Sequence, residues 1–303
     1  MTAKFFTNSN SLHGVRVLSL ALNLPGPAAL MRCRQMGATC VKLEPPGAQG
    51  QPSDPMAQYA PDAYAQLHEG VLHVAADLKT AEGQQALHAE LAQADVLLTS
   101  FRPSALARLG MDWEALHARH PRLCMVAIVG APAERAEEPG HDLTYLAESG
   151  LITGLDLPPT LYADMAGSLM ASEAVLQALL QRAMAADGAG VRIEVALSEA
   201  ARYLALPRHW GLTLPSAPVG GAHAGYRIYP CADGRVTIAA LEPHFAQRLA
   251  VAAGLGAEGG KGMFRSSVHA GIAAFVATLT CDQLDALALA HDIPMHSLRD
   301  DAP

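Results

Sequence analysis

An alternation of short apolar runs with helical segments over residues 15–129 is the feature that most constrains the fold. Residues 15–21 are rich in Val and Leu, residues 28–36 have helical spacing that ends at Gly37, and residues 41–44, which precede Pro45-Pro46-Gly47, form a second predicted strand. A strand, a helix and a strand in this order predict a βαβ unit, whose usual place is a parallel sheet. The order recurs in the predicted strands 72–76, 94–99 and 123–129 and in the predicted helices 81–93, 104–109 and 113–119.

The second half of the chain continues this pattern and then changes character. Residues 165–185 are apolar on nearly all sides, which predicts a long buried helix, and residues 191–197 alternate like a strand. Further on, Asp233-Gly234 separates two alternating runs, which is a strong hairpin signal. We therefore predict an α/β protein with a large Rossmann-like domain, residues 1–205, and a smaller α+β domain, residues 206–303.

Charge and composition exclude several classes of protein. The 303 residues carry a net charge of −8 and form no basic stripe, so nucleic acid is not an expected partner. No apolar run reaches membrane-spanning length, so we expect no membrane association. The cysteines are odd in number and contain no C-x-x-C pair, which favours reduced thiols in a cytoplasmic protein over a disulfide framework or a zinc site. They are Cys33, Cys40, Cys124, Cys231 and Cys281.

The glycine pattern excludes one enzyme class that the alternation would otherwise suggest. No G-x-G-x-x-G sequence follows the first predicted strand, although a dinucleotide-binding domain carries that fingerprint there. A nicotinamide-dependent dehydrogenase is therefore not predicted.

Two ionisable residues of different chemistry stand near predicted helix starts. His141 follows Pro139-Gly140 at the beginning of a short helix that ends at Gly150, and Asp164 immediately precedes the long apolar helix. An Asp in that position is most often a helix cap, and a His after Pro-Gly is most often a surface turn residue. Held by a rigid framework, the two side chains could instead serve as an acid/base pair.

A series of motifs in a fixed order resembles family III CoA-transferases of the CaiB/BaiF type, the group that also contains alpha-methylacyl-CoA racemase. Each motif alone is weak, but their order along most of the chain is specific. The motifs are LHGVRVLSLA with PGPAA, MGATCVKLEPPG, DLKTAEG, ADVLLTSFRP, PRLCMVAIVG, PGHDLTYLAESG, YADMAGS and YRIYPCADGRVTIAALEPHF.

The resemblance implies an acyl-CoA substrate, no metal, no cofactor beyond the CoA moiety, and a homodimer of two interlocked chains. Asp164 matches the residue that is the nucleophile of the transferases and a proton-transfer residue of the racemases. His141 matches the racemase histidine, and Glu242 matches the glutamate that pairs with it. Three basic residues would lie along the CoA phosphates: Lys42, Lys79 and Arg102.

Three functions are compatible with these residues. The presence of all three racemase-type residues favours inversion at the α carbon of a 2-methylacyl-CoA. A CoA-transferase using an aspartyl-CoA intermediate at Asp164 is the alternative, although Gly220-Gly221-Ala222 is less glycine-rich than the transferase loop. Because the sequence stops at Pro303, we expect the C-terminal segment that returns to the large domain in the resembling family to be missing, which leaves an inactive CoA-binding paralogue as a third interpretation.

Overall fold

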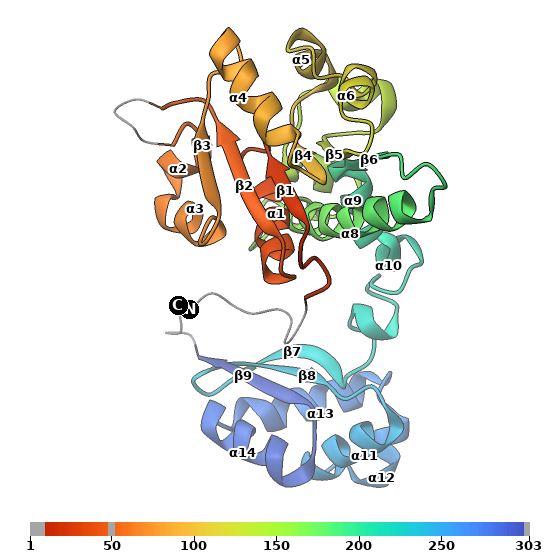
Figure 1. The fold of residues 1–303 in the computed structure, drawn as a ribbon. Coiled ribbons are helices and arrows are strands. Elements are labelled where there is room, and N and C mark those ends of the chain that lie inside the picture. Colours follow the sequence, from red (N-terminus) through yellow and green to blue (C-terminus); the bar gives the residue numbers. More distant parts are fainter. Residues whose placement is uncertain (1–9, 48–51, 300–303) are drawn as a thin grey trace. The chain divides into compact units, whose positions relative to one another are not determined.

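The computed structural model describes residues 10–47 and 52–299, and the chain divides between Ala205 and Leu206 into two compact units (Figure 1). The first unit contains a six-stranded parallel sheet with the order β3-β2-β1-β4-β5-β6. The predicted Rossmann-like parallel sheet is therefore confirmed. Its strands are β1 (Arg16–Ser19), β2 (Thr39–Glu44), β3 (Leu72–Ala75), β4 (Val96–Thr99), β5 (Cys124–Val129) and β6 (Arg192–Ala196).

The strand order reverses direction at β1, which lies between β2 and β4. Val17 of β1 is in register with Cys40 on one side and Val96 on the other. In doubly wound sheets, ligands bind outside the carboxyl ends of the strands at such a reversal. The topology therefore predicts a ligand site at the carboxyl ends of β1 and β4.

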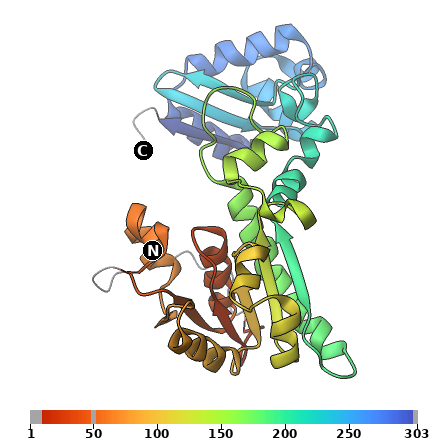
Figure 2. The ribbon, with the colours of Figure 1, turned by 90° about the horizontal axis from the view of Figure 1, so that it is seen from above.

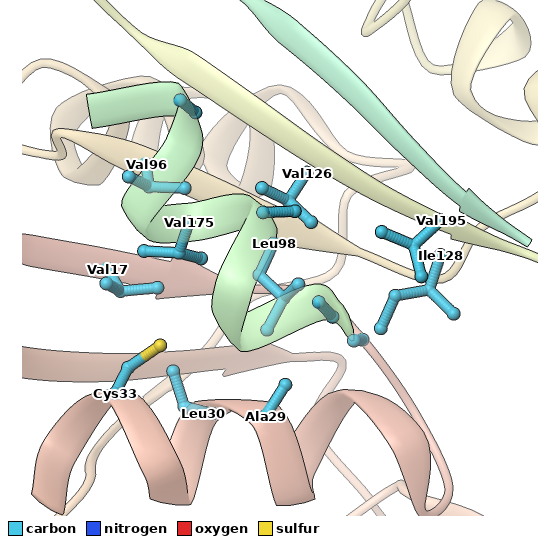
Figure 3. Close-up of a cluster of buried hydrophobic side chains, with 14 of the residues drawn as sticks. Val17, Ala29, Leu30, Cys33, Val96, Leu98, Val126, Ile128, Val175 and Val195 are labelled. Atoms are coloured by element: carbon cyan, nitrogen blue, oxygen red, sulfur yellow. The ribbon is translucent and has the colours of Figure 1, made fainter. Parts of the chain in front are cut away.

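One face of this sheet is covered by helices α1 (Pro25–Gln35) and α8 (Tyr162–Met184), which also pack against each other. Figure 3 shows Leu30 and Cys33 of α1 and Val175 of α8 directed at the sheet residues Val17 and Leu98. Successive strand residues point to opposite faces, so Leu18 and Leu97 belong to the core of the other face. That face is covered by α4 (Ala81–Leu91), α5 (Pro103–Arg108) and α6 (Trp113–Arg119).

Helix α8 is not buried on all sides, which corrects the prediction made from its composition. Its sheet-facing side carries small residues such as Ala171 and Ala178, which are fully buried. Its other side exposes large apolar side chains, with Leu180 62% and Met184 78% exposed. An all-round apolar sequence does not reveal how many neighbours pack against the helix within one chain.

Two short helices, α2 (Pro55–Tyr59) and α3 (Pro61–Leu67), were not predicted, and a buried ion pair holds the start of α2. The carboxylate of Asp54 caps α2 by accepting the backbone N–H of Met56 at 3.0 Å. Its other oxygen lies 3.0 Å from the ammonium of Lys42, which also donates to the carbonyl of Ala21. Both charged side chains are completely buried, so each depends on the other.

The second unit is an antiparallel sheet with helices on one face (Figures 1 and 2). The predicted hairpin is present, because β7 (Tyr226–Cys231) and β8 (Gly234–Ala239) pair across Ala232-Asp233. Strand β9 (Met295–Arg299) pairs with β8 on its other side. The helices on that face are α11 (Pro243–Ala252), α12 (Gly256–Lys261), α13 (Ser266–Ala277) and α14 (Cys281–His291), and the short helix α10 (Leu206–His209) is not among them.

Among the described residues, no single helix has the length and apolar character needed to cross a membrane. Only α13 and α14 taken together meet that criterion by length and composition, and they are bent by 119° relative to each other.

Replacing Lys42 by Met should lower the free energy of unfolding by about 3–5 kcal/mol, because Asp54 would remain as an unpaired buried charge. Urea unfolding followed by circular dichroism measures the loss. Lys79→Met is the matched control, since Lys79 is exposed and its replacement should change stability by less than about 0.5 kcal/mol. Equal stability of the two variants would contradict a structural role for Lys42.

Candidate active site

A cavity of about 340 Å³ lies at the carboxyl ends of β1, β4 and β5, where the strand order reverses. The cavity is lined by His141 and Asp164, the possible acid/base pair named from the sequence, and also by Arg102. Segments that follow the three strands supply the rest of the lining, which includes Leu22, Asn23, Ser100, Phe101, Val129 and Gly130.

His141 is held at the start of α7 (Asp142–Glu148), where it is the N-cap residue, as its position after Pro-Gly predicts. The hydroxyl of Thr144 donates to the carbonyl of His141 at 2.7 Å and accepts its backbone N–H at 3.0 Å. These bonds fix the main chain of His141 and leave its side chain exposed at the cavity.

Asp164 is the third residue of α8, and this corrects its predicted place as the N-cap, which Leu161 occupies. In the first turn of a long helix, its carboxylate is stabilised by the positive end of the helix dipole. Opposing that effect, burial and, to a smaller extent, the carboxylate of Asp142 raise the pKa of Asp164, whereas His141 lowers it, and together they bring this pKa to about 6. The result is a carboxyl group that can change protonation state near neutral pH.

Asp142 connects the two helices that carry this pair. Its buried carboxylate accepts the backbone N–H of Asp164 at 3.0 Å and thereby ties the start of α7 to the start of α8. Asp142 was not predicted as a site residue, although it stands beside His141 in Gly-His-Asp. Its burial could not be inferred from that position alone.

Tyr145 lines the cavity from the first turns of α7 and depends on two glycines. A Cβ atom on Gly130 would lie 2.4 Å from its hydroxyl oxygen, and one on Gly140 would lie 2.6 Å from it. Contacts that short do not occur, so any larger residue at either position would displace the ring. The glycines therefore keep room for a phenol at the cavity wall.

A short segment, η2 (Ala133–Glu137), forms another wall of the cavity and is anchored on both sides. The carboxylate of Glu137 accepts the backbone N–H and the hydroxyl of Ser104 at 2.7 and 2.9 Å. Arg135 forms an ion pair with Glu148 of α7 at 2.8 Å. Through these contacts the wall is connected to both α5 and α7.

The three basic residues expected along CoA phosphates lie in different environments. Arg102 is exposed at the cavity, and Lys79 is exposed in a separate open hollow beside Arg108. Lys42 is completely buried against Asp54, so its ammonium is not available to a phosphate. The expectation that Lys42 contacts CoA is corrected on this ground, because breaking the pair would leave a buried charge.

Glu242 lies in the second unit, where it is the exposed N-cap residue of α11. Its contact with His141 stays a prediction, because His141 belongs to the first unit.

The cavity shows no cluster of metal ligands within the part of the chain that the structure describes. No three His, Cys, Asp or Glu side chains that line it have ligand atoms within 4.8 Å of one another.

Comparison with known proteins now identifies the family. The model of CoA-transferase family III matches residues 12–302. The chain belongs to CoA-transferase family III.

Relatives in this family include both racemases and transferases. Human alpha-methylacyl-CoA racemase is 30% identical over 81% of this chain and 65% of its own length. Succinyl-CoA–D-citramalate CoA-transferase of Chloroflexus aurantiacus is 30% identical over 93% of this chain and 77% of its own. A probable fatty acyl-CoA transferase of Mycobacterium tuberculosis is 29% identical over 78% and 67%. The chain thus spans about two thirds of the length of several curated relatives that it matches.

Solved structures of family III proteins have the same fold. The crystal structure of a CaiB/BaiF family protein from Brucella suis has a TM-score of 0.77, is 25% identical, and matches 95% of this chain and 84% of its own. A Mycobacterium tuberculosis protein matches with a TM-score of 0.78 over 95% and 85%, and at 24% identity it supports the fold alone.

We expect the Asp142→Asn variant to lower the pKa of Asp164 from about 6 towards its ordinary value of 3.8. The amide oxygen can still accept the Asp164 N–H, whereas the repulsive negative charge is removed. A ¹³C NMR titration of the aspartate carboxyl carbons measures the shift.

Exposed Asp156 is the matched control for this titration, and its Asn variant should leave the Asp164 signal unchanged. If the Asp164 carboxyl titrates at the same pH in wild type and in Asp142→Asn, Asp142 does not tune it.

Proposed function

We propose that this protein acts on CoA thioesters and inverts the α carbon of a 2-methylacyl-CoA by removing and returning a proton. One observation carries the proposal: the carboxyl of Asp164, with its pKa raised to about 6, lines the same cavity as His141. General acid–base catalysis is most efficient when the pKa of the group lies near the working pH. A carboxyl tuned in this way is suited to accept a proton from carbon and to give one back.

The two groups would act from opposite faces of the substrate carbon. When the substrate has one configuration at its α carbon, ionised Asp164 removes the α proton and protonated His141 donates a proton to the opposite face of that carbon. With the opposite configuration the roles are exchanged, so each group must be able to act as acid and base. Because the proton leaves one face and returns to the other, the net result is inversion with no change in composition.

The negative charge that develops on the thioester oxygen needs stabilisation during this step. The start of α8 beside Asp164 supplies the positive end of a long helix dipole, which favours an enolate oxygen placed there. In the proposal, Glu242 accepts a hydrogen bond from His141 and fixes its tautomer. That contact, and the interlocked homodimer that the family resemblance implies, are predictions.

Arg102 and Lys79 are proposed to hold the phosphates of CoA. Arg102 has the stronger support, since it is exposed at the mouth of the cavity that contains Asp164. A guanidinium group can bind a phosphate through two parallel hydrogen bonds.

Replacing Arg102 by Gln should weaken acetyl-CoA binding roughly tenfold or more, because a charge-assisted hydrogen bond is lost. Isothermal titration calorimetry at low salt measures the change, and binding by the wild type should weaken as salt is added. Arg192→Gln is the control, since Arg192 pairs with Glu194 and does not line the cavity. Unchanged affinity of Arg102→Gln would remove Arg102 from the proposed binding site.

A CoA-transferase remains the second candidate, because several relatives carry that name and because Asp164 could attack the thioester instead of its α proton. Attack would join the Asp164 carboxyl to the acyl group, expel CoA as thiolate and give a mixed anhydride. The thiolate would then attack the Asp164 carbonyl, release the first acid and leave an aspartyl-CoA thioester. A second carboxylic acid would then receive the CoA.

Deuterium exchange distinguishes the two reactions. In D2O, the racemase should introduce deuterium at the α position of a 2-methylacyl-CoA without an acceptor acid, as measured by mass spectrometry. His141→Ala should slow inversion by roughly 10²–10⁴-fold, since one face loses its proton-transfer group. His13→Ala is the matched control, because His13 is exposed and does not line the cavity.

A different result would contradict the racemase assignment. If hydroxylamine traps an adduct at Asp164 and the protein moves CoA to a carboxylic acid, the reaction is transfer. If acetyl-CoA binds but neither exchange nor an adduct is found with several acyl groups, the protein is a CoA-binding paralogue without this chemistry.

A further inference from the structure

Two cysteine thiols that are distant in sequence meet in the second unit. The Sγ atoms of Cys231 and Cys281 lie 3.7 Å apart, within contact distance, and all five cysteines of the chain are free thiols. Cys231 ends strand β7 and Cys281 begins helix α14. The candidate active site in the first unit makes no use of this pair.

The two segments are held together by hydrogen bonds in which the thiols take no part. The backbone N–H of Ala232 donates to the carbonyl of Leu279 at 2.9 Å. The carboxylate of Asp233 accepts the backbone N–H of Cys281 at 2.7 Å. Because one of these hydrogen bonds lies next to each cysteine, the fold of the second unit itself holds the two thiols close together.

The two thiols differ in accessibility in a way that suits a stepwise reaction. Cys231 is only partly buried, so a small molecule in solution can reach it, whereas Cys281 is completely buried. An accessible thiol beside a buried partner is the arrangement in which the first is modified and the second resolves the modification.

We propose that Cys231 and Cys281 form a redox-modification site that closes to a reversible disulfide. The oxidant is a low-molecular-weight disulfide. The Cys231 thiolate attacks one of its sulfurs, forms a mixed disulfide and releases one thiol. Cys281 then loses its proton and attacks the Cys231 sulfur, which releases the second thiol. In total, two protein S–H bonds become one S–S bond, and two electrons reduce the small disulfide to two thiols.

Asp233 adds a third potential metal ligand to the two thiols, so a bound cation is the competing interpretation. Cys231, Cys281 and Asp233 place one ligand atom each within 4.8 Å of the others. Structural zinc sites are closed by four ligands, and the described residues supply only these three. One oxygen of the Asp233 carboxylate is also already bonded to the backbone N–H of Cys281. A disulfide needs neither a fourth ligand nor the carboxylate.

The full chain, equilibrated with mixtures of reduced and oxidised glutathione and then alkylated, tests the proposal. In oxidising mixtures we expect an intact mass lower by two hydrogens and a linked pair of peptides that contain Cys231 and Cys281. Dithiothreitol should reverse both changes. The linked peptides should be absent from Cys231→Ser and Cys281→Ser and present in Cys33→Ala, which removes a buried thiol of the first unit.

Other outcomes would overturn the proposal. One is glutathione retained on Cys231 without a link to Cys281, and another is that both thiols remain alkylatable in the most oxidising mixture. A third is stoichiometric zinc in the isolated protein that is lost in Cys231→Ser. Because Cys231 is only partly buried, we expect that variant to fold like the wild type, and circular dichroism serves as the check.

Discussion

The hydrogen bond from the backbone N–H of Asp164 to the buried carboxylate of Asp142 is the interaction on which the candidate site depends. It joins the first turns of α7 and α8, two helices whose starts are separated by a long connector. The same carboxylate repels the negative charge of Asp164 and so raises its pKa in the direction that burial already sets. One buried group thus holds the backbone at Asp164 in place and adds to the effect of burial on the pH at which the Asp164 carboxyl ionises.

The sheet supplies the framework for this interaction. Because β1, β4 and β5 are parallel neighbours, the segments that follow them meet at one edge, where the strand order reverses. Close packing keeps the helices in place around that edge. A Cβ atom on Gly167 of α8 would lie 2.3 Å from Leu197 at the start of α9 (Leu197–Leu204), so the two helices approach as closely as a glycine allows. The position of Asp164 at the start of α8 therefore depends on this close packing as well as on Asp142.

The strands and the hairpin could be predicted from the sequence because their signals are local. The apolar run 123–129 contains β5, and the hairpin turn lies at Ala232-Asp233, one residue before the predicted Asp233-Gly234. The missed features depend on contacts between distant residues. The burial of Lys42 follows from its partner Asp54, and the exposed side of α8 follows from the packing around it. The pair His141 and Asp164 could be named from the motifs, but their shared cavity and the role of Asp142 required the fold.

The pH dependence of α-proton exchange tests most directly whether Asp142 tunes Asp164 for catalysis. If ionised Asp164 removes the proton, the rate of deuterium incorporation from D2O should fall below about pH 6, where this carboxyl becomes protonated. In Asp142→Asn, the loss of the repulsive charge should move this acid limb to lower pH while exchange persists. An acid limb at the same pH in both proteins would contradict the account.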